Sequence, residues 1–130
     1  MEGENVTAKW EKYETLSAGE NRCRVYLTWC YTGPDLTVRL FNEGAHVGAV
    51  ALGQFDRVSG RASVSTITVP GHRDDIVAAE AAKLLAEATR RPVCVAAGIH
   101  LEDIKGEEIL LIVKNCQLLV GLLLGQLVKQ

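Results

Sequence analysis

The carboxyl-terminal run EEILLIVKNCQLLVGLLLGQLV, residues 107–128, constrains the fold more than any other part of the chain. It predicts one long helix with apolar side chains on nearly all sides. Polar residues interrupt the run at Lys114, Asn115, Gln117 and Gln126, so it differs from a membrane span of roughly 18 or more apolar residues. We expect the chain's own sheet to bury one side of this helix. A second subunit would bury the other, giving a homodimer through residues 107–128 and no membrane contact.

Alternating apolar and polar residues in the first half of the chain predict strands. RCRVYLTWCYT alternates, and a Gly-Pro-Asp turn leads into LTVRLF, which together indicate a hairpin. The run AHVGAVAL is apolar on both faces and is typical of a central strand. A polar loop, QFDRVSGR, follows it, and residues 1–20 are expected to be a loose or edge segment. The predicted strands are 22–32, 36–41, 45–52, 62–69 and 92–97.

A second helix is predicted over residues 74–91, where acidic residues at the start and arginines at the end suit the helix dipole. Its apolar stripe is expected to be Val77, Ala81, Leu84, Leu85 and Ala88. Strands followed by helices predict an α+β fold, a mostly antiparallel sheet with two helices packed on one face. A chain of 130 residues predicts a single domain, residues 1–130.

Composition excludes several classes of function. A formal net charge of -2 and 5% aromatic residues give no footprint for nucleic acid or an anionic membrane. The polar amino-terminal residues contain no apolar signal segment, so we expect a cytoplasmic protein. The four cysteines lack metal-binding spacings and are expected to be small buried hydrophobic residues: Cys23, Cys30, Cys94 and Cys116.

The turn TVPGHRDD, at the start of the predicted helix, is the first candidate site. Gly71 allows the turn, and His72 and Arg73 add donors beside the free amide groups of a helix start, which favour a phosphate. The alternative is an ordinary helix start, because Asp74 and Asp75 already complement the dipole and would oppose an anion.

Two further histidines lie at similar edges of apolar runs. His46 is near Gly48, and His100 follows Gly98 at the end of a buried strand. Each is either a structural histidine or part of a pocket that the three loops form together. Three histidines can also hold a catalytic metal, but no short spacing joins any pair, and we expect no metal site. Since nucleophile and nucleotide-binding motifs are also missing, a binding protein is favoured over an enzyme.

These motifs resemble one family. Four motifs are similar to those of the small D subunits of gallate decarboxylase, the LpdD family. They are AHVGAVAL, the Ser/Thr-rich strand leading into TVPGHRDD, the helix AAEAAKLLAEAT, and AAGIHLEDI before a terminal helix beginning EEI. The resemblance covers roughly residues 35–128. It implies a dimeric, non-enzymatic chaperone that binds reduced prenylated flavin mononucleotide (FMN) and passes it to a UbiD-type decarboxylase. It also implies a fold similar to that of proteasome assembly chaperones.

A flavin cargo suggests roles for the candidate residues. The turn with Gly71, His72 and Arg73 would hold the phosphate, Gly48 and Gly98 would let the backbone approach the ring, and His46 and His100 would bind polar edges. The alternatives left open are a protein-assembly module of the same fold without a small ligand, and a metal-dependent enzyme using the three histidines.

Overall fold

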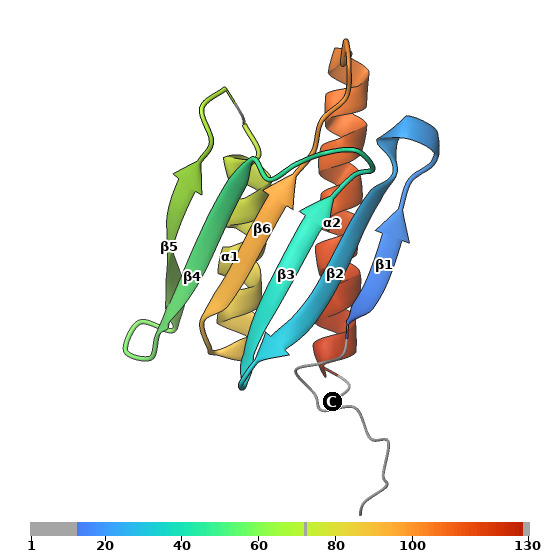
Figure 1. Ribbon diagram of the computed structural model, residues 1–130. Coiled ribbons are helices and arrows are strands. Elements are labelled where there is room, and N and C mark those ends of the chain that lie inside the picture. Colours follow the sequence, from blue (N-terminus) through green and yellow to red (C-terminus); the bar gives the residue numbers. More distant parts are fainter. Residues whose placement is uncertain (1–12, 72, 129–130) are drawn as a thin grey trace, which may run out of the picture.

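The computed structural model describes residues 13–71 and 73–128. Six strands form one sheet in the order β1-β2-β3-β6-β4-β5, and two long helices lie on one face of it (Figure 1). Neighbouring strands are antiparallel except β3 and β6, so the predicted α+β fold is confirmed. The elements are β1 (Glu14–Ala18), the 3-10 helix η2 (Asn21–Cys23), β2 (Val25–Thr32), β3 (Asp35–Phe41), β4 (Ala49–Asp56), β5 (Arg61–Thr68), α1 (Asp75–Thr89), β6 (Val93–Gly98) and α2 (Gly106–Val128).

The predicted strands are present, but their ends differ by more than one residue in three places. Residues 22 and 23 belong to η2. There the Arg22 side chain donates to Glu108 in α2 and to the Glu102 carbonyl in the loop before α2, which draws the chain away from the strand. Residues 45–48 form a loop, and β4 instead continues to Asp56 through residues expected to lie in a polar loop. The part of residues 1–20 that the structure describes contains β1, an edge strand as expected.

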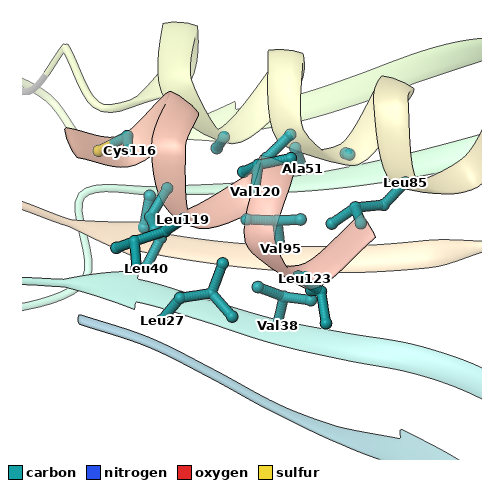
Figure 2. Packing of buried hydrophobic residues seen from close by; sticks show 14 of the residues in the cluster. Leu27, Val38, Leu40, Ala51, Leu85, Val95, Cys116, Leu119, Val120 and Leu123 are labelled. Atoms are coloured by element: carbon teal, nitrogen blue, oxygen red, sulfur yellow. The ribbon is translucent and has the colours of Figure 1, made fainter. Parts of the chain in front are cut away.

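The hydrophobic core lies between the sheet and the two helices (Figure 2). Alternate residues of the central strands point into it, as the periodicity of β2 and β3 predicted. Fully burying one such side chain contributes about 1.5–3 kcal/mol. The largest completely buried side chains are Leu27, Leu40, Leu85, Leu119, Leu123, Val25, Val38, Val93 and Val95.

Helix α1 faces the sheet with smaller residues than the sequence suggested. Leu84 and Ala88 of the predicted stripe are exposed, so that part of the prediction is wrong. A Cβ atom added to Gly53 of β4 would lie 3.0 Å from the Ala86 Cβ, which shows how closely helix and strand approach. This close packing favours alanine over leucine on the buried face. The buried residues are Ala78, Ala81, Ala82, Leu85 and Ala86.

Helix α2 is buried on one side by the sheet, as predicted. The buried amide of Asn115 is satisfied because its Nδ2 donates to the Cys23 carbonyl at 2.9 Å. The opposite side carries exposed leucines at positions 110, 111, 118 and 122. By length and composition α2 would be able to cross a membrane, a property it shares with core helices of soluble proteins. Pairing of two copies through this exposed side stays a prediction.

Candidate binding pocket

The pocket lies at one end of the sheet, beyond the carboxyl termini of strands β3, β5 and β6. Strands β3, β5 and β6 run in the same direction, because β6 is parallel to β3 and both β5 and β6 are antiparallel to β4. Their carboxyl ends therefore share one edge, the upper edge in Figure 1, and the loops that follow them meet there. A cavity of about 520 Å³ lies between these loops and α2. It is lined by His46, Gly71, Arg73, Asp74, Val77, Ile99, His100, Ile104, Ile109, Ile112 and Val113.

Four of the predicted site residues line this one cavity. His46 comes from the loop after β3, Gly71 and Arg73 from the loop after β5, and His100 from the loop after β6. They lie far apart in the sequence, and the sheet topology brings them together. His72, the remaining residue of the predicted phosphate turn, lies outside the described residues.

Two of the three predicted glycines, Gly48 and Gly98, hold the loops of the pocket together. A Cβ atom on Gly98 would collide with the backbone carbonyl of His46, so only glycine lets the His46 loop cross the end of β6. The Gly48 amide donates to the Ala97 carbonyl at 2.8 Å, and its carbonyl accepts from the Val69 amide, also at 2.8 Å. These contacts position the loops after β3 and β5. Contact of either glycine with a flavin ring stays a prediction.

Asn42 holds His100 in place and was missed by the sequence analysis. Its buried side chain accepts a hydrogen bond from the His100 amide at 3.0 Å and donates to the His100 carbonyl at 2.8 Å. The His100 Nε2 also lies 2.8 Å from a carboxylate oxygen of Glu102. An asparagine after a strand suggests a turn, and nothing in the sequence reveals a partner 58 residues away.

Charge in the pocket is divided between its opening and its wall. The Arg73 side chain is 81% exposed and lies 3.9 Å from the Asp75 carboxylate. Helix α1 begins at Asp75, so its amino-terminal end, the positive end of its dipole, borders the cavity. Asp74 is buried in the wall and opposes an anion placed deep inside. An anionic group is therefore accommodated best at the opening, within reach of Arg73.

The rest of the wall is apolar and was also missed. Its helical residues have the spacing and hydrophobicity of an ordinary core stripe, and its other two residues lie in the loop after β6, so the sequence carried no signal that they face a cavity. They come from α1, the loop after β6 and the first turns of α2: Val77, Ile99, Ile104, Ile109, Ile112 and Val113.

Metal binding and cysteine nucleophilicity find little support in the parts of the chain that the structure describes. Across residues 13–71 and 73–128, no group of three or more His, Cys, Asp or Glu is placed to hold a metal ion. All four cysteines are free; Cys23 and Cys116 are buried as expected, whereas Cys30 and Cys94 are half-buried. Burial raises the pKa of the Cys116 thiol to about 12, which makes it a poor nucleophile at neutral pH.

Comparison with known proteins identifies the family. The model of the prenylated flavin chaperone LpdD-like domain matches residues 19–128. The chain belongs to this family. The match includes η2 and β2, which the resemblance drawn from sequence motifs did not reach, whereas β1 precedes it. No curated protein matches the chain by sequence.

Among solved structures, the fold is similar to a chain from a yeast structure described as a novel chaperone complex for 20S proteasome assembly. The TM-score is 0.54 at 16% identity, over 86% of this chain and 98% of that chain. At this identity the similarity concerns the fold alone, and it confirms the predicted likeness to proteasome assembly chaperones.

Proposed function

We propose that this LpdD-like protein is a non-enzymatic carrier that holds reduced prenylated FMN in the pocket and delivers it to a UbiD-type decarboxylase in the cytoplasm. The observation that carries the proposal is the convergence of His46, Arg73 and His100 from three separate loops around a single cavity. Its volume, about 520 Å³, is within the usual range for small-molecule and cofactor sites, roughly 300–1,000 Å³. Membership of a family named for prenylated flavin chaperones supports the same cargo.

The charges and polar groups suggest how the flavin lies. Its phosphate would bind at the opening, where Arg73 and the start of α1 are favourable and Asp74 is farther away in the wall. His46 and His100 would hydrogen-bond the ribityl chain or the polar edge of the ring system. Both histidines are exposed beside the cavity, as a ligand site requires and a purely structural histidine does not.

The open position of the site suits transfer more than storage. Arg73 and His100 are largely accessible to water, so a phosphate bound there keeps part of its hydration and is released readily. A carrier with its cargo at the rim of a sheet also leaves room for a partner protein to approach. We place the contact between two copies along the exposed leucines of α2, on the side of that helix that faces away from the sheet.

Anaerobic titration tests the proposal. The purified protein is titrated with reduced prenylated FMN and reduced FMN, and binding is followed by calorimetry. We expect saturable binding of the prenylated form. Removing a charge-assisted hydrogen bond costs about 1.5–3 kcal/mol, so Arg73→Ala should weaken binding roughly 10-fold or more. The matched control is Arg57→Ala, in the exposed turn between β4 and β5 at the opposite edge of the sheet.

A comparison with riboflavin isolates the phosphate. Because riboflavin lacks the phosphate, Arg73→Ala should leave its binding unchanged, and an equal loss for both flavins would contradict the assigned orientation. Failure of the wild-type protein to bind any flavin would reject the carrier function. It would favour the second candidate, a protein-assembly module, for which the exposed leucines of α2 offer a contact surface.

A further inference from the structure

The pocket has two chemically different halves. The loops after β3, β5 and β6 contribute the polar residues, whereas the side facing α2 is entirely aliphatic. Ile109, Ile112 and Val113 are spaced three and four residues apart, so they lie on one face of α2 and form a continuous apolar surface. Ile104 extends this surface along the loop that precedes the helix.

Part of this aliphatic surface is exposed to water although it lies beside a cavity. Ile109 is 47% and Ile104 is 40% exposed, whereas Ile112 is nearly buried and anchors α2 to the core. Exposed isoleucines at a concave site provide favourable burial for a ligand, because covering them releases water from apolar surface. A ligand that matched only the polar half would leave them exposed.

Prenylated FMN differs from FMN by an additional hydrocarbon ring fused to the flavin, which brings no new hydrogen-bonding group. Apolar contact with this ring is therefore a direct way to discriminate between the two flavins. We infer that the aliphatic half formed by Ile104, Ile109 and Val113 binds this prenyl-derived ring and selects the prenylated cofactor. This inference rests on the proposed function.

The size of the preference follows from the chemistry of apolar pockets. One methylene group in such a pocket changes discrimination by about 10–200-fold, so the wild-type protein should prefer reduced prenylated FMN over reduced FMN by at least roughly 10-fold. Ordinary FMN would still bind through its phosphate and polar ring edge, with the aliphatic half only partly covered.

A pair of neighbouring substitutions tests the assignment. Ile109→Asn places an amide in the aliphatic half, and Leu110→Asn makes the same kind of change one residue further along α2, where the side chain is 69% exposed and does not line the cavity. We expect Ile109→Asn to reduce the preference about 10-fold or more while the affinity for FMN changes less than about twofold. Leu110→Asn should keep the wild-type preference, because any effect on the proposed contact between copies would act on both flavins alike.

A second substitution covers the case in which Ile109→Asn does not fold, which thermal unfolding would reveal. Val113→Thr keeps the shape and replaces a methyl group by a hydroxyl, so the same selective loss is expected at smaller size. Equal losses for both flavins would overturn the inference, as would a wild-type protein that binds both flavins equally, although flavin binding itself would then stand. Failure to bind either flavin would reject the proposed function instead.

Discussion

Gly98→Ala is the most direct test of how the pocket is assembled. The new Cβ would overlap the His46 carbonyl oxygen and lie 2.8 Å from the carbonyl carbon, whereas ordinary contacts are 3.4–4 Å. The backbone of the His46 loop must therefore retreat by roughly half an ångström or more, and inserting a carbon into so tight a contact costs about 1–3 kcal/mol. We expect the free energy of unfolding to fall by this amount, measured by equilibrium urea denaturation with an unchanged slope.

The matched control is Gly106→Ala, at the first residue of α2. A Cβ there meets no atom within 4 Å, so its effect on the free energy of unfolding should stay within about 0.5 kcal/mol. Since His46 moves with its loop, flavin affinity should fall for Gly98→Ala and not for Gly106→Ala. A Gly98→Ala protein as stable as the wild type would refute the close crossing of β6 by the His46 loop.

Two further predictions concern α2. Leu118→Glu, on its exposed side, should convert a homodimer into monomers in analytical ultracentrifugation, because each copy would bury an unpaired charge; a surviving dimer would place the interface elsewhere. Arg22 donates to both Glu108 oxygens, at 2.7 and 2.9 Å. These two hydrogen bonds, with a third from the Lys105 amide, lower the Glu108 pKa from 4.5 to about 2. The charged Glu108 therefore stabilises the fold fully above pH 4.5, and this stabilisation is lost as pH falls toward 2. The difference in melting temperature between wild type and Glu108→Gln should close across that pH window. A difference that stays constant with pH would contradict this.

Much of the local structure could be predicted, and the errors have identifiable tertiary causes. The hairpin of β2 and β3 and both helices followed from periodicity and turn chemistry. Residues 45–48 are predicted as part of a strand because they begin the largely apolar run AHVGAVAL. In the structure they cross the end of β6 and therefore cannot continue β4. The exposed position of Leu84 reflects the close approach of α1 to Gly53, which favours alanine on the buried face.

The candidate site was predicted only in its polar half. His46, Arg73 and His100 could be identified because polar residues at the edges of apolar runs suggest functional loops. Asn42 could not, because its hydrogen bonds join two loops 58 residues apart. The aliphatic half could not either, since Ile109 and Val113 have the spacing of an ordinary core stripe, and only the position of α2 beside the three loops shows that they face a cavity.

The sequence by itself determined most local elements and the polar residues at the edges of apolar runs, because periodicity and turn chemistry act over a few neighbouring residues. The tertiary structure alone decided that β6 enters the sheet between β3 and β4, parallel to β3. Strand pairing joins residues regardless of their separation along the chain, so local patterns do not encode it. That pairing places three loop ends at one edge of the sheet and so creates the pocket.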